Sequence, residues 1–292
     1  MRAFVEPLEE LSGFEEMTHN MQQDGLISIT GCIDAQKPHM IYGVGNGRKN
    51  KIIVTFHEQK AKELYEDYRL FDPAVVYYPA KDVLFYQSDI RGNLLTAERI
   101  QALRAIHEQD EVTVITTFDA LMNTMAPAKQ LWDSICRIAP EDTIDLEQMK
   151  DLLVCMGYEK EYQVESMGQF AIRGGILDIF PLTEDNPVRI EMWGDEVDTI
   201  RSFDVESQKS IENLDEVVIY PACELVLTEA AKRAGIEKLL KEAESFSKKL
   251  RKEMKTEEAH RALSQAQELA EEWGELAVTA GMDAFLSYFC EE

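Results

Sequence analysis

The segment GCIDAQKP, from Gly31 to Pro38, keeps part of a phosphate-binding loop. In the GxxxxGK[ST] loop, glycines let backbone N–H groups wrap a phosphate, the lysine reaches it, and the final hydroxyl binds Mg²⁺. Gly31 and Lys37 are present, but Gln36 replaces the second glycine. Pro38 replaces the hydroxyl residue, and proline has neither a hydroxyl group nor an N–H group. We therefore expect a vestigial loop that is retained as part of the fold and binds no cofactor. The alternative is a residual nucleotide site.

A different chemistry, protein recognition, is indicated between Phe170 and Ser210. Turn compositions such as Gly-Gly and Gly-Asp-Glu separate short strand-like runs, which predicts an antiparallel meander. In the run VRIEMW, side chains alternate, so Arg189, Glu191 and Trp193 share one face of the sheet. A tryptophan beside an arginine on a polar face is typical of a protein-binding hot spot.

Other reactive side chains form no convincing set. The histidines lie far apart in the sequence, and none is near a nucleophile signature, although His57 is placed to cap a helix. The carboxylates of the meander fall at predicted exposed and turn positions, where solvation explains them: Asp178, Glu191, Asp195, Glu196 and Asp198. The five cysteines include no CxxC pair, which favours buried thiols in a reducing cytoplasm. We expect no catalytic residue and no metal site.

The overall charge argues against one class of partner, duplex DNA. The chain of 292 residues has 30 Lys and Arg against 55 Asp and Glu, a formal net charge of −25. Because phosphate contacts dominate affinity for duplex DNA, this charge argues against non-specific DNA binding by the chain alone. No apolar run is long enough to span a membrane.

The elements that must position these residues change along the chain. Up to about residue 130, strand-like runs at 26–30, 51–56, 74–78 and 112–117 alternate with helical stretches at 58–71 and 94–108. Near-continuous β-branched runs separated by helices predict a parallel sheet that is covered on both faces. A helix at about 145–156 ends at Gly157 before the meander, and 228–275 is predicted to be helical with a break at Gly235.

The motifs RGGILDIFP, PVRIEMWGDEVDTIRSFDVESQKS and VVIYPACE resemble the bacterial transcription-repair coupling factors. The resemblance covers most of residues 24–225 and extends to the excision-repair protein UvrB. It implies a degenerate P-loop helicase-like parallel α/β domain with an inserted small α+β domain, a UvrB-like module. The implied division is 1–134 for the first part, 135–220 for the insertion, and 221–292 for helices that return to complete the first.

The same resemblance implies a function for the inserted domain, which is to bind UvrA in transcription-coupled nucleotide excision repair. The matching site residues are Arg173, Arg189 and Trp193, where the family often has phenylalanine at the last position. The sequence alone leaves it open whether Arg173 joins that surface or pairs with Asp178 inside the sheet. The family's contacts with RNA polymerase and DNA belong to domains that this chain lacks, so the resemblance implies that the protein continues beyond Glu292.

A UvrB-type ATP-dependent excinuclease subunit is the alternative. The resemblance separates the two, since UvrB has an intact phosphate loop and an aromatic hairpin near Tyr77 and Tyr78. Here the loop is broken, and the stretch from Tyr78 to Gln87 leaves no room for that hairpin. From the sequence we expect Arg189→Ala and Trp193→Ala to weaken UvrA binding and to leave thermal stability nearly unchanged.

Overall fold

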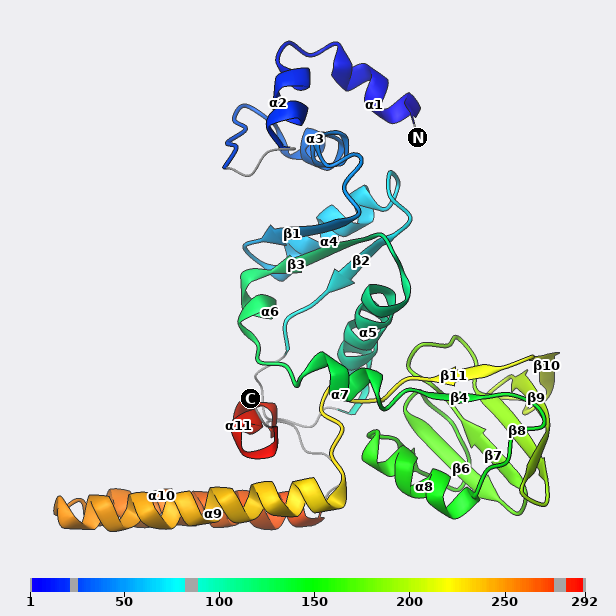
Figure 1. The fold of residues 1–292 in the computed structure, drawn as a ribbon, viewed down its shortest axis with the longest axis vertical. Coiled ribbons are helices and arrows are strands. Elements are labelled where there is room, and N and C mark those ends of the chain that lie inside the picture. The colour runs from blue at the N-terminus through cyan, green and yellow to red at the C-terminus, as the bar shows by residue number, and fades with distance from the viewer. Residues whose placement is uncertain (1, 22–25, 82–88, 276–281, 291–292) are drawn as a thin grey trace. The chain divides into compact units, whose positions relative to one another are not determined.

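The computed structural model describes all residues except 1, 22–25, 82–88, 276–281 and 291–292 (Figure 1). The chain forms two compact units. Unit 1 comprises Met1–Lys81 and Gln101–Asn123, and unit 2 comprises Asp82–Ile100 and Thr124–Glu292. Helix α5 (Asp89–Glu108) contributes residues to both. The mixed α/β class is confirmed, and the division at 134 and 220 stays a prediction.

Unit 1 contains the predicted parallel sheet. Strands β1 (Asn50–Thr55), β3 (Val112–Thr117) and β2 (Val75–Tyr78) pair in the order β1-β3-β2, all parallel. Helix α4 (Glu58–Tyr68) packs against all three strands (Figure 1). As predicted, His57 caps this helix, because its Nδ1 accepts a hydrogen bond from the Lys60 N–H at 3.2 Å.

Short helices complete unit 1. They are α1 (Arg2–Glu9), α2 (Phe14–Met21), the 3₁₀ turn η1 (Asp34–Gln36), α3 (Lys37–Val44) and α6 (Phe118–Met122). Phe14 of α2 and Tyr42 of α3 are buried in one apolar cluster with Tyr68 and Ile115. This cluster joins the first three helices to the sheet.

The strand predicted at Leu26–Thr30 is wrong. These residues have no regular secondary structure, and Leu26 is almost fully exposed. The run carries β-branched residues, but a strand is stabilised by hydrogen bonds to a neighbour, and no strand of the described sheet pairs with it. A local pattern of five residues therefore predicted a strand that the ladder does not contain.

Unit 2 contains the predicted meander. Six strands pair in the order β10-β9-β8-β7-β6-β5, all antiparallel except β5 with β6. Their bounds are β5 (Glu159–Lys160), β6 (Gln169–Arg173), β7 (Ile176–Ile179), β8 (Val188–Trp193), β9 (Glu196–Phe203) and β10 (Ser210–Asn213). Helix α8 (Leu146–Cys155) packs on β5 and β6, and Gly157 follows it at φ +85°. The predicted helix end is thus confirmed.

One face of the meander is its core. Residues that pair across the strands on this face are almost completely buried: Phe170, Leu177, Ile179, Val188, Ile190 and Ile200. Strands β4 (Cys136–Ile138) and β11 (Val217–Ile219) form a separate antiparallel pair. Within unit 2, Arg99 of α5 forms a buried ion pair with Glu224, with Nη2 donating to Oε2 at 3.0 Å. This pair attaches the first half of α5 to the segment that follows β11.

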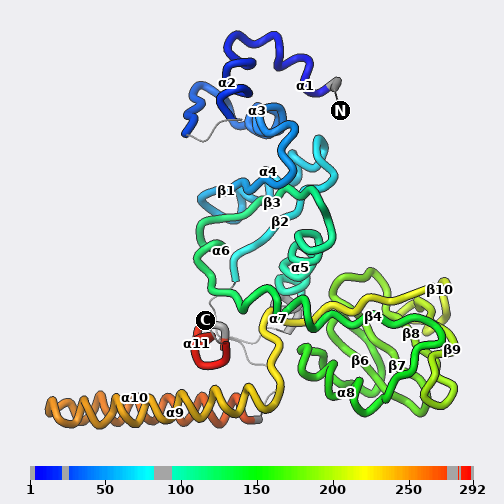
Figure 2. Tube along the Cα trace, in the orientation of Figure 1, coloured from blue at the N-terminus to red at the C-terminus, as the bar shows by residue number. Residues whose placement is uncertain are grey.

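The remaining helices of unit 2 form a hairpin. Helices α9 (Glu229–Lys252) and α10 (Thr256–Glu275) run side by side, as Figure 2 shows. The predicted break at Gly235 is wrong, because α9 continues through it and the chain turns at Met254, whose φ is +66°. A Cβ at Gly235 would lie 2.2 Å from the Phe289 ring, so close packing rather than a helix end accounts for this glycine. The other helices are α7 (Ala128–Trp132), η2 (Met282–Phe285) and α11 (Leu286–Phe289).

Candidate partner-binding surface

The register of the meander places the predicted arginines on one face. Asp178 of β7 pairs directly with Arg189 of β8, and residues that pair directly across strands point to the same side. Arg173 pairs with Ile176, two residues before Asp178, so its side chain also projects on that side. This face lies opposite the apolar core face, and both alternatives for Arg173 hold together: it shares the face and pairs with Asp178.

A buried carboxylate stands at the centre of this face. The Asp178 side chain is 1% exposed and accepts hydrogen bonds from two guanidinium groups. Arg189 donates from Nε to Oδ1 at 2.6 Å and from Nη2 to Oδ2 at 2.8 Å. Arg173 donates from Nη2 to Oδ2 at 2.6 Å. We call these three residues the arginine fork; with one carboxylate and two guanidinium groups, its net charge is +1.

Arg189 is held more firmly than Arg173. Its guanidinium carbon lies 4.5 Å from the centre of the buried Phe203 ring, in cation–π contact. Nη2 also donates to Oε1 of Gln208 at 3.1 Å. The hydrogen bond to Asp178 is the main cause of a raised pKa for Arg189. Its side chain is 15% exposed, against 36% for Arg173, so Arg173 presents more surface to solvent.

Trp193 lies at the end of β8 with its side chain in solvent. It is 85% exposed, and it follows Arg189 and Glu191 at alternate positions of the strand, as the sequence predicted. The pairing register between β8 and β9 shifts after Glu191, because Asp198 of β9 is an extra residue without a partner in β8. Since the extra residue lies in β9, the side chains of β8 continue to alternate between the two faces. Gly194, at φ +67°, begins the tight turn into β9. A large aromatic surface is therefore presented on the same face of β8 as Arg189, without burial in this chain.

Residues 136–225, which include the whole meander, match the family profile of the UvrB interaction domain. We therefore call residues 136–225 the UvrB interaction domain, after the family profile that they match. The chain is also similar to transcription-repair-coupling factors, with 31% identity over 242 residues to that of Bacillus subtilis strain 168. Identity to the Staphylococcus aureus strain Mu50 protein is 30% over 255 residues. These matches confirm the family predicted from the sequence.

The two matches cover most of this chain but only a small part of each relative. They cover 82% and 86% of this chain, but only 20% and 22% of the respective relatives. The chain thus spans about a fifth of the length of the curated relatives it matches. The UvrB interaction domain lies entirely within unit 2.

One expectation about the UvrB interaction domain is corrected by its geometry. Asp178 was expected to be solvated, but it is buried between two arginines. The same geometry leads us to expect a loss of stability in Arg189→Ala, because the variant lacks three hydrogen bonds that Arg189 donates, two of them accepted by the buried carboxylate. The signal that sequence reasoning missed is the aspartate inside the apolar run ILDIF, which a buried counter-ion explains. Phe203 and Gln208 were missed because neither is near Arg189 in sequence.

The degenerate phosphate loop lies outside the UvrB interaction domain, in unit 1. Gly31 has φ +84°, and α3 begins at Lys37 with Pro38 in its first turn. A proline there removes one of the N–H groups that a helix N-terminus offers to a phosphate. Lys37 Nζ instead contacts Asp34 Oδ1 at 2.7 Å, and both side chains are largely exposed. This ion pair is the main cause of a lowered pKa for Asp34.

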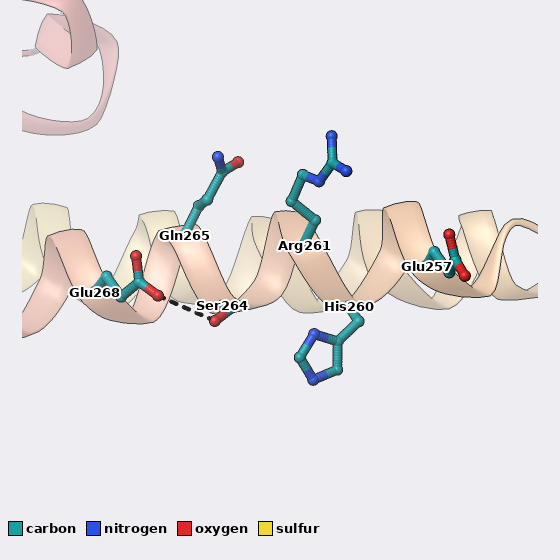
Figure 3. A pocket seen from close by; sticks show the side chains of 6 residues that line it. All are labelled: Glu257, His260, Arg261, Ser264, Gln265 and Glu268. Carbon is teal, nitrogen blue, oxygen red and sulfur yellow. Dashed lines mark hydrogen bonds between the residues drawn. The ribbon is translucent and has the colours of Figure 1, made fainter.

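The other candidate groups offer no reacting set. Among the described residues, no cluster of three His, Cys, Asp or Glu side chains is arranged to hold a metal ion. A shallow pocket on α10 is lined by side chains that project from the helix in different directions (Figure 3). Burial raises the pKa of the Cys223 thiol to about 12, which keeps it protonated and unreactive at neutral pH. Over the helices that the structure describes, none combines the length and apolarity needed to cross a membrane.

Proposed function

We propose that this chain recruits UvrA in transcription-coupled nucleotide excision repair, as part of a transcription-repair-coupling factor. The observation that carries the proposal is an exposed tryptophan on the same sheet face as a cationic arginine fork, in a domain that matches the UvrB interaction family. In a chain of net charge −25, a fork of charge +1 is a local exception, and it favours an acidic patch on the partner.

In our proposal, the arginine fork makes polar contacts with UvrA and Trp193 makes an apolar contact. Toward the described residues, Arg189 uses Nε and Nη2 and Arg173 uses Nη2, so we assign the Nη1 groups of both to a partner carboxylate. Trp193 supplies an apolar face that becomes buried on association. Arg173, Arg189 and Trp193 are therefore the residues that we assign to UvrA contact.

The rest of the chain and the other domains of the full-length protein have separate roles in our proposal. In our proposal, unit 1 is the degenerate P-loop helicase-like domain, residues 135–220 are inserted into it, and 221–292 complete it. The fragment itself is non-catalytic and takes no cofactor. RNA polymerase and DNA are bound by other domains of the full-length protein, which works in the bacterial cytoplasm.

The decisive experiment is calorimetric titration of UvrA with the Trp193→Ala variant. We expect affinity to fall about 30-fold, because truncating a hot-spot aromatic typically costs ~2 kcal/mol. Thermal stability should stay unchanged, since the side chain is exposed. The matched control is Tyr162→Ala, an aromatic of 84% exposure that lies outside β6–β9, and it should bind UvrA normally. Wild-type affinity in the Trp193→Ala variant would refute the proposed surface.

A UvrB-type ATPase is the competing function, and it requires phosphate binding at Gly31–Pro38. The contact between Lys37 and Asp34, and Pro38 in the first turn of α3, both favour the non-catalytic proposal. Titration with Mg-ATP should give no binding heat. The stretch where UvrB has its aromatic hairpin includes 82–88, which lie outside the described residues, so nucleotide binding is the cleaner test.

A further inference from the structure

We propose that Asp178 is a positioning residue for UvrA recognition, an inference that rests on the proposed function above. Asp178 itself is too deeply buried to touch a partner. It acts by fixing the guanidinium planes of Arg173 and Arg189 before the partner arrives. The structure assigns it this role because it is the one acceptor shared by both arginines among the described residues.

Pre-organisation follows from the contacts around Asp178. Arg189 is constrained in plane by two hydrogen bonds to the carboxylate and from one side by the Phe203 ring. Gln208, from the turn after β9, fixes the same Nη2 group. Arg173 is bound to the same Oδ2 atom as Arg189 Nη2, so the two guanidinium groups converge on one point. Long arginine side chains otherwise lose rotamer freedom when they bind, and that loss weakens affinity.

Charge alone predicts the opposite effect of Asp178. The carboxylate reduces the charge of the fork from +2 to +1, so an acidic partner would be attracted more strongly without it. The main core lies on the other face of the sheet and is apolar throughout β6–β8, so folding there depends chiefly on apolar burial. A buried ion pair is also a weak source of stability compared with apolar side chains of the same volume. Positioning and simple electrostatics therefore make opposite predictions for one substitution.

The test is Asp178→Asn in the full 292-residue chain, titrated with UvrA by calorimetry. Asparagine keeps the shape but removes the charge, so the guanidinium groups lose their charged acceptor. We expect UvrA affinity to fall about 10-fold, the cost of ordering two long side chains on binding. Unchanged or tighter binding by a folded Asp178→Asn variant would overturn the proposal and favour simple electrostatics.

The matched control is Glu191→Gln, which removes the same charge from the same face. Glu191 pairs with Arg201, outside the fork, so this variant should bind UvrA as well as the wild type or more tightly. A loss as large as that of Asp178→Asn would show that any carboxylate on this face matters, and it would overturn the positioning role.

A second variant keeps the proposal testable where Asp178→Asn does not fold. Gln208→Ala removes the other acceptor of Arg189 and leaves the carboxylate in place. We expect it to weaken UvrA binding about threefold with a small fall in thermal midpoint, since it loses the hydrogen bond from the Arg189 guanidinium and the one that Gln208 Nε2 donates to Val205 O. Wild-type affinity in this variant would count against positioning. Normal binding by Trp193→Ala would instead refute the proposed function, so the two failures are distinguishable.

Discussion

Two Asp–cation pairs in this chain have similar distances and different consequences. In the degenerate phosphate loop, Lys37 contacts Asp34 at 2.7 Å, three residues away in sequence. In the UvrB interaction domain, Arg189 contacts Asp178 at 2.6 Å, from the neighbouring strand. Each aspartate contacts a second cation, Lys60 for Asp34 and Arg173 for Asp178, but the cluster around Asp34 is largely exposed whereas Asp178 is buried.

The difference shows what makes an ion pair informative about function. A solvated pair on a short helix gains little, because water screens it and two flexible side chains must be ordered. A buried carboxylate must be neutralised, so its arginines are held in one geometry. In the loop, Lys37 is therefore held weakly by an exposed aspartate, whereas the meander holds its arginines in place on the face that carries an exposed tryptophan.

The largest effect should come from Arg189→Ala. This change leaves a buried carboxylate with Arg173 as its one remaining cation, which should reduce the free energy of unfolding by ~3 kcal/mol. Urea unfolding followed by circular dichroism measures it. A companion variant, Arg189→Ala with Asp178→Ala, should recover part of the loss. Wild-type stability in the single variant would remove the contrast between the two pairs.

Arg173→Ala should have a smaller effect on stability. Arg173 makes one hydrogen bond to Asp178 and is more exposed, and Arg189 still neutralises the carboxylate in its absence. We expect a loss of ~1 kcal/mol or less in the same urea unfolding measurement. UvrA affinity should nevertheless fall clearly, since Arg173 presents more of its side chain to a partner. A larger stability loss than that of Arg189→Ala would reverse the order that the geometry assigns.

Lys37→Ala should have the smallest effect. The lysine is exposed and pairs with an exposed aspartate, so the thermal midpoint should shift by less than the error of the measurement. Binding of UvrA should be unaffected, which the same calorimetric titration checks. A marked loss of stability or of UvrA affinity would show that the lysine of the phosphate loop contributes to folding or to UvrA binding.

Much of the fold was predictable because it is encoded locally. The parallel strands β1, β2 and β3 and the cap at His57 follow from short-range patterns of β-branched, apolar and polar residues. The failures are non-local. Leu26–Thr30 has the composition of a strand but no partner in the described sheet, and Gly235 lies inside a helix because this glycine makes room for the distant Phe289 rather than ending the helix.

The candidate partner-binding surface also has one part that is encoded locally and another that depends on distant residues. Alternation along β8 determined by itself that Arg189 and Trp193 share a face, because successive side chains of a strand point to opposite sides. Only the tertiary structure decided that Asp178 is buried, that Arg173 reaches it, and that Phe203 and Gln208 hold Arg189. These facts depend on which strands pair and in what register, and a register is fixed by burial of the whole sheet rather than by any one segment.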